Sequence, residues 1–145
     1  MYGAVFQLDS YEHLLPGDQC ALMVALVEAL AGVNCAFLEA NRVPRLYVSG
    51  VVYAMPETLA KKFPRDSQPW RDIPRILATT KTATCHELCA WRVAELRTFE
   101  GVHAEPYVTA EWSGGRLMFH VQVKLPGGQI EDPSANLGMG DPWAR

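Results

Sequence analysis

The sequence predicts an α+β domain, in which two helices precede a set of short antiparallel strands. The alanine- and leucine-rich stretch 21–31 carries almost no charge, which is typical of a helix buried on most of its sides. A second helix is predicted from Cys85 to about Arg97, because its apolar residues fall on one stripe of a helical wheel. After Gly101 the apolar period changes to two, which indicates strands. We therefore expect the second helix to pack on a small antiparallel sheet, with the N-terminal helix covering another surface.

Length and composition favour one globular domain spanning residues 1–145. The chain is 49% hydrophobic and 20% charged, close to the averages for globular proteins. Its net charge of −3 and the absence of a basic run argue against a nucleic-acid partner, since such binding neutralises phosphates. The N-terminus lacks the basic region of a signal peptide, so we expect no secretion by that route and four reduced cysteines. The uncharged stretch 20–27 is shorter than the roughly 18 residues of a membrane span, so we expect no membrane partner.

The N-terminal half contains several turn signals. Residues 16–17, Pro-Gly, are predicted to form a turn, and Asp18 is predicted to be the N-cap of the first helix. Residues 46–53 read as one kinked strand or a tight pair of strands. The proline-rich segment 56–74 predicts a surface loop or short helix, and 73–80 predicts a helical turn.

The C-terminal half reads as a meander of strands. Strands are predicted over 107–112, 116–124 and 129–132, with glycine-containing turns between them. The tail 134–145 is predicted to be a loosely held wrap. Residues 1–72 would then support a core formed by 73–139.

Three residues in this order suggest nucleophilic chemistry. Cys85 begins a helix, His120 lies in a following strand, and Asp132 ends the next strand. The positive end of a helix and a nearby imidazolium both stabilise a thiolate nucleophile. A histidine can serve as the base, and a carboxylate on its other nitrogen fixes the orientation of the ring. The turn at 126–128 would allow His120 and Asp132 to be neighbours on adjacent strands.

These residues also resemble a known family. Cys85-His-Glu-Leu, followed by His120-Val-Gln-Val-Lys-Leu-Pro-Gly-Gly-Gln-Ile-Glu-Asp132-Pro-Ser, resembles the core of the transglutaminase-like superfamily of papain-like cysteine enzymes. The resemblance covers roughly residues 73–139. It implies a Cys-His-Asp triad that catalyses acyl transfer or amide hydrolysis on a protein or peptide substrate, without a cofactor. A cysteine protease, an amidase and an acyltransferase are all compatible with it.

A second resemblance covers most of the chain. Residues 46–53, 70–74 and 85–97 are similar to small proteins of tailed bacteriophages that are described as transglutaminase-like. This similarity implies a protein of the host cytoplasm or the virion, with other phage structural proteins as partners. It also implies an alternative function, a non-catalytic structural or adaptor protein of the phage particle. The phage proteins often read Gly-Asp-Cys-Glu-Asp-Leu, whereas here Thr84 precedes the cysteine and His86 follows it.

An acyl-transfer site also needs donors for the developing oxyanion. The backbone N–H of Cys85 could supply one of them. Trp70 and Thr80 are candidates for a second donor, and the sequence does not distinguish between them.

Other interpretations of the same residues remain open. Cys85 could be a small core residue, because a lone cysteine on the buried face of a helix usually is. The set Cys85, His86, Cys89 and His120 could bind zinc, but no second cysteine pair completes the usual spacing, so we expect no metal. Two acidic residues of the helix, Glu87 and Glu95, are expected on a solvated face, paired with Arg92 or Arg97.

Overall fold

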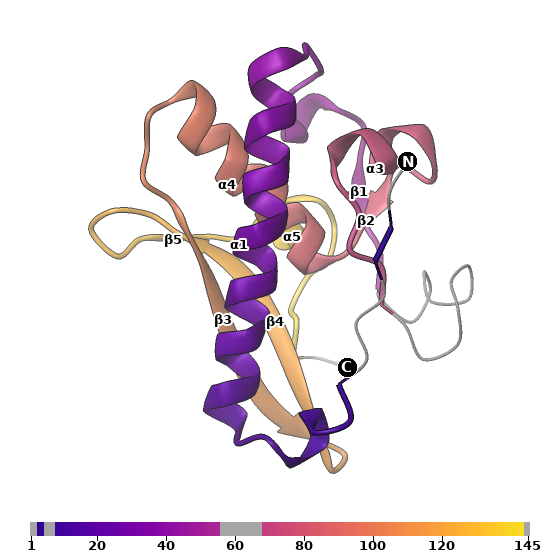
Figure 1. Cartoon of the computed structure of the whole chain (residues 1–145), viewed down its shortest axis with the longest axis vertical. Coiled ribbons are helices and arrows are strands. Elements are labelled where there is room, and N and C mark those ends of the chain that lie inside the picture. Colours follow the sequence, from indigo (N-terminus) through magenta and orange to yellow (C-terminus); the bar gives the residue numbers. More distant parts are fainter. Residues whose placement is uncertain (1–2, 5–7, 56–67, 144–145) are drawn as a thin grey trace.

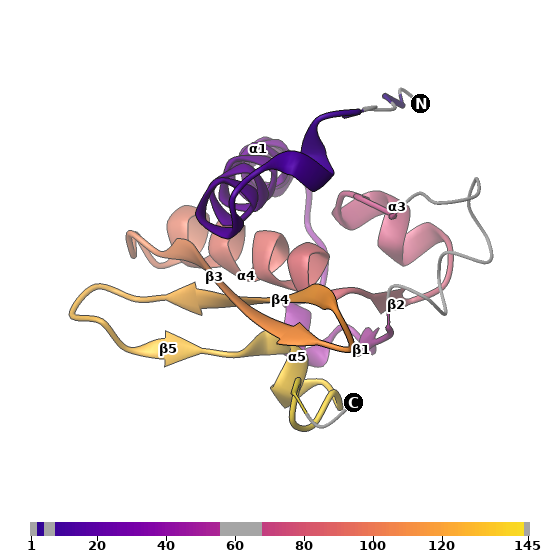
Figure 2. The ribbon, with the colours of Figure 1, turned by 90° about the horizontal axis from the view of Figure 1, so that it is seen from below.

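The computed structural model describes residues 3–4, 8–55 and 68–143. It has three layers (Figures 1 and 2): helix α1 (Pro16–Ala40) lies along helix α4 (Cys85–Phe99), and α4 lies on a three-stranded sheet. The α+β class and the N-terminal helix are therefore confirmed. Because α4 is enclosed between α1 and the sheet, most of its residues are buried, including all of those from Cys85 to Trp91.

Helix α1 begins earlier than the sequence suggested. Pro16 and Gly17 form its first turn, with Leu15 as N-cap, so the predicted turn at 16–17 and the predicted N-cap at Asp18 are both wrong. Proline is well suited to the first helical position, because its fixed φ is helical and the N–H that it lacks would have no partner there. The helix continues through Gly32 and ends before Pro44.

The inner side of α1 buries Val27, Ala31, Asn34 and Leu38. By length and composition alone, α1 is the one helix among the described residues that could cross a membrane, with a mean hydropathy of 2.0 in its most apolar window. Core helices and signal sequences also meet this criterion, and 22% of the window is buried. Glu28, which interrupts the uncharged stretch, is paired with the guanidinium of Arg97 on α4 at 2.9 Å.

The sheet has the order β3-β4-β5 and is antiparallel throughout. Strands β3 (Glu105–Ser113) and β4 (Arg116–Lys124) pair along their full length. Their connection uses two glycines with φ of 56° and 77°, the left-handed conformation that a two-residue hairpin turn of this type requires. The third strand, β5 (Ile130–Glu131), pairs with the end of β4, so the predicted meander is confirmed.

The tail does not begin as a loose wrap. Asp132 follows β5 and caps helix α5 (Pro133–Asn136), with its carboxylate accepting a hydrogen bond from the N–H of Ala135 at 3.1 Å. An aspartate N-cap followed by proline at the first helical position is a common helix start.

The segment 46–53 forms neither a kinked strand nor a tight pair. It contains a 3-10 turn, η2 (Leu46–Val48), then strand β1 (Val52–Tyr53), which pairs in parallel with β2 (Thr82–Ala83). The N–H of Leu46 donates to the buried carboxylate of Glu95 at 2.7 Å, which holds this turn against α4. Gly50, at φ 83°, then redirects the chain toward β1.

Two further short helices complete the described chain, η1 (Tyr11–His13) and α3 (Ile73–Ala78), the latter confirming the predicted helical turn. Of the predicted loop 56–74, residues 56–67 lie outside the described residues. Asp72 caps α3 by accepting from the N–H of Arg75, and Asn34 of α1 accepts from the N–H of Ile73. These two bonds fix the segment that leads into α3 against the rest of the fold.

The core on the α3 side of α4 is organised around Trp91, which is fully buried. Its indole N–H donates to the Glu95 carboxylate at 3.0 Å. We predict that Trp91→Ala lowers the free energy of unfolding by about 3–5 kcal/mol, because it leaves a large cavity. Urea denaturation measures the loss, and Trp112→Ala on the exposed end of β3 should change stability by less than about 0.5 kcal/mol. Equal effects of the two substitutions would contradict this packing.

Candidate active site

Cys85 is the first residue of α4, where the unpaired N–H groups of the helix concentrate positive charge. Its residue exposure is 8%. The helix begins here because Thr84 and Glu87 cap it: the Glu87 carboxylate accepts from the backbone N–H of Thr84 at 3.1 Å. The helix start thus fixes the backbone position of the cysteine.

His120 and Asp132 are hydrogen-bonded, with 2.7 Å between Nε2 of the histidine and Oδ2 of the aspartate. Gln122, two residues along β4, donates to the same carboxylate oxygen at 3.0 Å. Since Nε2 is occupied by Asp132, Nδ1 is the ring nitrogen left for Cys85. The arrangement brings together all three residues that the sequence proposed as a triad.

The electrostatics of the three side chains favour a thiolate and an imidazolium. Burial raises the pKa of Cys85, but its hydrogen bonds with His120 and His86 and the charges of the two rings outweigh burial and lower the pKa to about 6. Burial lowers the pKa of His120, yet its bonds with Asp132 and Cys85 raise the net pKa to about 9. The pKa of Asp132 is lowered despite burial, chiefly by His120. Between about pH 6 and pH 9 the charged pair is therefore the favoured state.

Only one of the two candidate oxyanion residues lies beside Cys85. Trp70 stacks on the ring of His86, the neighbour of Cys85, with 4.1 Å between ring centroids and an interplanar angle of 25°. Thr80 is bound elsewhere: its hydroxyl accepts from Arg71 at 3.0 Å and donates to the carbonyl of Thr82 at 3.1 Å. Thr80 thus has no donor left for a substrate.

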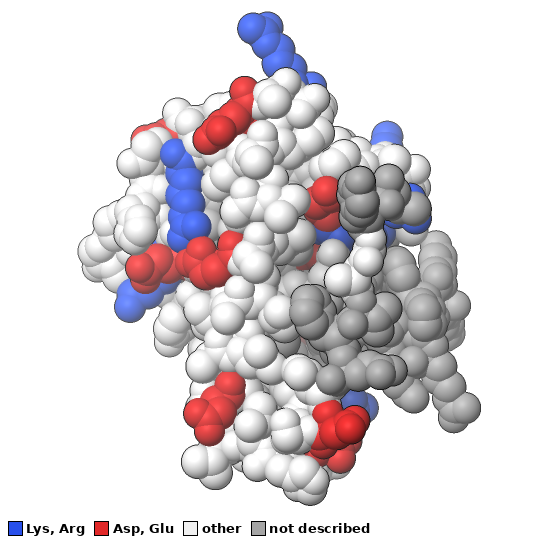
Figure 3. Space-filling model, in the orientation of Figure 1, with Lys and Arg blue, Asp and Glu red and all other residues white. Residues whose placement is uncertain are grey.

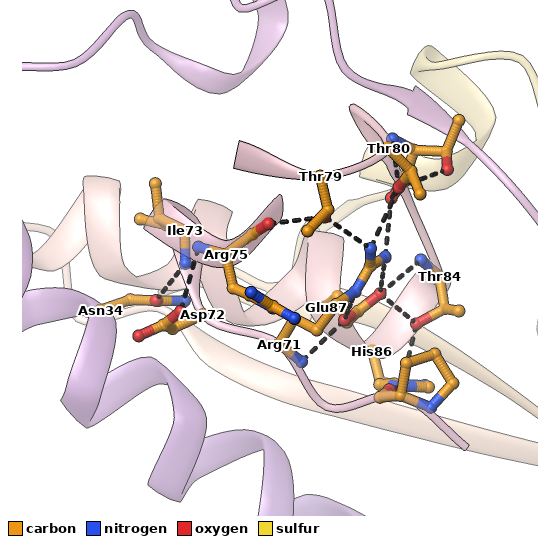
Figure 4. Close-up of polar contacts among 12 residues, drawn as sticks. Asn34, Arg71, Asp72, Ile73, Arg75, Thr79, Thr80, Thr84, His86 and Glu87 are labelled. Carbon is orange, nitrogen blue, oxygen red and sulfur yellow. Dashed lines mark hydrogen bonds and ion pairs between the residues drawn. The ribbon is translucent and has the colours of Figure 1, made fainter. Parts of the chain in front are cut away.

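A buried ion pair lies behind the start of α4 (Figure 4). Arg71 donates to the Glu87 carboxylate through its backbone N–H at 2.7 Å and through two guanidinium nitrogens at 2.9 Å. The side chains are 5% and 0% exposed. Glu95 is also buried, although it does contact Arg92 at 3.4 Å. The expectation that Glu87 and Glu95 lie on a solvated face is wrong, because α4 is covered on all sides near these positions.

Sequence reasoning missed two aromatic neighbours of the triad. His86 is 2% exposed and interacts with Cys85 by a hydrogen bond. Sequence position gave little signal for this contact, because neighbouring side chains on a helix point about 100° apart and the ring of His86 is held by Pro69 and Trp70 from a distant segment. Trp143, in the tail, approaches the ring of His120 edge-on at 6.2 Å between centroids. Nothing local in the sequence connects residue 143 with strand β4.

The other thiols occupy different environments. Cys89 is buried one turn after Cys85, with its thiol 3.2 Å from the carbonyl oxygen of Gln122, and burial raises its pKa well above the usual value. All four cysteines are free. Among the described residues, no group of three or more histidine, cysteine or acidic side chains is arranged to hold a metal ion. On the face drawn in Figure 3, lysine and arginine side chains are scattered rather than gathered into a patch.

We predict that Arg71→Ala lowers the free energy of unfolding by about 3–5 kcal/mol, because it leaves the Glu87 carboxylate buried without its cation. Glu28→Gln is the matched control. It breaks the ion pair with Arg97, in which the Arg97 side chain is 25% exposed and the Glu28 side chain 38%. The substitution should lower the free energy of unfolding by less than about 1 kcal/mol. Urea denaturation of both variants tests this, and a loss below 1 kcal/mol for Arg71→Ala would show that the buried pair is dispensable.

No family model, curated protein or solved structure matches this chain.

Proposed function

We propose that the protein is a cysteine-dependent enzyme that hydrolyses an amide or peptide bond, or transfers its acyl group to an amine. The observation that carries the proposal is the 2.7 Å bond from His120 to Asp132, formed while the same ring interacts with the Cys85 thiol at the start of α4. A cysteine that only filled the core would have no use for an oriented imidazole. The lowered pKa of Cys85 supports a nucleophile that is ionised at neutral pH.

In the proposed reaction the Cys85 thiolate attacks the carbonyl carbon of the substrate. The imidazolium of His120 then donates its proton to the leaving amine as the carbon–nitrogen bond breaks, and an acyl thioester remains on Cys85. Neutral His120 next takes a proton from water or an acceptor amine, which attacks the thioester and releases the thiolate. Asp132 keeps the ring oriented and stabilises its charged form.

For the oxyanion of the tetrahedral intermediate we propose the backbone N–H of Cys85 as one donor. It is the first N–H of α4 and has no partner within the helix. The indole N–H of Trp70 is the proposed second donor, supported by the stacking of Trp70 on the neighbour of Cys85. Thr80 is not proposed, because its hydroxyl is committed to the Arg71 network.

The arrangement of elements also supports a papain-like or transglutaminase-like core. A helix that begins with the nucleophile packs on an antiparallel sheet, and the sheet carries the histidine with the aspartate at the end of the next strand. On this basis we propose a protein or peptide substrate. The resemblance of residues 46–53, 70–74 and 85–97 to small proteins of tailed bacteriophages supports a phage protein that acts in the host cytoplasm or in the virion. The alternative is a structural or adaptor protein of the phage particle that retains the fold without catalysis, and the experiments below distinguish the two.

The reactivity of Cys85 tests the proposal. In a variant with Cys20→Ser and Cys35→Ser, we expect alkylation by iodoacetamide to rise with a midpoint near pH 6. The midpoint is more informative than the rate at one pH. At pH 7 the thiolate fraction of Cys85 would exceed that of an unperturbed thiol on the order of a hundredfold. The lower intrinsic nucleophilicity of a low-pKa thiolate would reduce the resulting gain in alkylation rate by about twentyfold. His120→Ala should raise the midpoint by at least about one pH unit, whereas His103→Ala, whose side chain is 80% exposed, should leave it unchanged.

Acyl-enzyme formation can be followed with p-nitrophenyl acetate, an activated ester. We expect a burst of one equivalent of p-nitrophenol and an acetyl group on Cys85 by mass spectrometry, both lost in Cys85→Ala. A wild-type midpoint near pH 9 together with no acetyl group on Cys85 would support the non-catalytic alternative.

A further inference from the structure

We propose that His86 is a second catalytic imidazole, which shares the stabilisation of the Cys85 thiolate with His120. The inference rests on the proposed function, because it takes Cys85 as the nucleophile. It adds a residue that the triad does not contain, placed directly after the cysteine in the first turn of α4.

The hydrogen bonds of His86 determine which ring nitrogen carries the proton. Nε2 lies 2.7 Å from the carbonyl oxygen of Pro69. It also lies 2.9 Å from Oγ1 of Thr84 (Figure 4). A carbonyl oxygen can only accept, and the Thr84 hydroxyl donates its proton to Glu87 at 3.3 Å. Nε2 is therefore protonated in every charge state of the ring, and Nδ1 is left for the thiol. A neutral His86 can accept a hydrogen bond from the thiol at Nδ1, and a charged His86 can donate a hydrogen bond to the thiolate.

The ring is also held in place. It is 2% exposed, and one face is stacked on Trp70 at 4.1 Å. Pro69 and Trp70 directly precede Arg71, which is bound to Glu87 in the same turn of α4. The chain segment that contacts His86 and the turn that carries it are thus joined by a buried ion pair, so the imidazole cannot readily turn away from the thiol.

The charges around Cys85 make His86 a stabilising partner. The groups that act on the Cys85 thiol are the imidazoles of His86, from α4, and His120, from β4. Around them, Glu87 acts on His86 and is bound to Arg71, Asp132 is bound to His120, and Cys89 lies one turn further along α4. Asp132 is neutralised by His120, and Glu87 by Arg71. The two imidazoles are the groups in this set whose positive charge is directed at the sulfur.

The two rings would act at different stages. His120 gives its proton to the leaving amine and recovers one from the attacking water or amine. His86 transfers no proton: it stays charged while the thiolate attacks, and again when the thioester's carbon–sulfur bond breaks and the electron pair returns to Sγ. Stabilising the thiolate as a leaving group speeds deacylation, so His86 would contribute most in the second half of the reaction.

The first test leaves His86 itself intact. Histidine titrations are followed by NMR in the wild-type protein and in Cys85→Ala. The hydrogen bond and the charge interaction between His86 and Cys85 stabilise both charged groups reciprocally. Replacing Cys85 by alanine should therefore lower the pKa of His86 by at least about one unit. Cys89→Ala, a buried thiol one turn away, should leave the His86 titration unchanged. A titration of His86 that is the same in wild type and Cys85→Ala would overturn the inference, because a purely structural histidine behaves in that way.

The second test uses the alkylation midpoint in the background without Cys20 and Cys35. His86→Gln should raise it by about one unit even though His120 and Asp132 are unchanged, and combining it with His120→Ala should return it to about 9 or above. A midpoint in His86→Gln equal to that of the wild type, near 6, would refute the role of His86 and leave the proposed triad standing. A wild-type midpoint near 9 would instead refute the thiolate and with it the proposed function. Should His86→Gln fail to fold, the NMR comparison decides the question alone.

Discussion

The arrangement around Cys85 depends on the buried ion pair between Arg71 and Glu87. A carboxylate with no exposed surface is tolerated only when it is fully hydrogen-bonded, and Glu87 accepts from Arg71 and from the backbone of Thr84. It also lies in the first turn of α4, where a negative charge is stabilised by the helix end. One carboxylate thus caps the helix that begins with Cys85 and anchors the segment that carries Trp70 over the site.

A second carboxylate, that of Asp132, holds the part of the site that contains His120. Asp132 uses one carboxylate oxygen to cap α5 and the other to bind His120 and Gln122. The side chain that caps α5 therefore also orients the ring of His120, and both contacts depend on the turn that brings β5 beside β4. Since α4 packs between α1 and the sheet, its N-terminus cannot shift relative to β4 without disturbing the core. Cys85 and His120 are thus positioned by packing, in addition to their own contacts.

Local patterns were sufficient to predict α4, the meander of strands and the order of Cys85, His120 and Asp132, because strong periodicity and glycine turns define these elements. The start of α1 was not predictable from its capping residues, since Pro16 suits a turn and a first helical position equally well. The burial of Glu87 depends on Arg71, which is sixteen residues away in the sequence. A helical wheel gives the faces of one helix, but it cannot show that two layers cover both of them.

Cys85 and Cys89 lie on the same face of one helix, a single turn apart, and both are buried, yet their pKa values move in opposite directions. The Cys89 thiol donates to the carbonyl oxygen of Gln122, which cannot stabilise negative charge, so burial dominates and the thiol stays protonated. Around Cys85, two imidazoles outweigh an equally unfavourable burial. Burial alone therefore does not account for the lowered pKa. The difference lies in which side chains the fold directs at each sulfur, and two oriented, hydrogen-bonded histidines around one thiol are an arrangement that a packing role for Cys85 does not require.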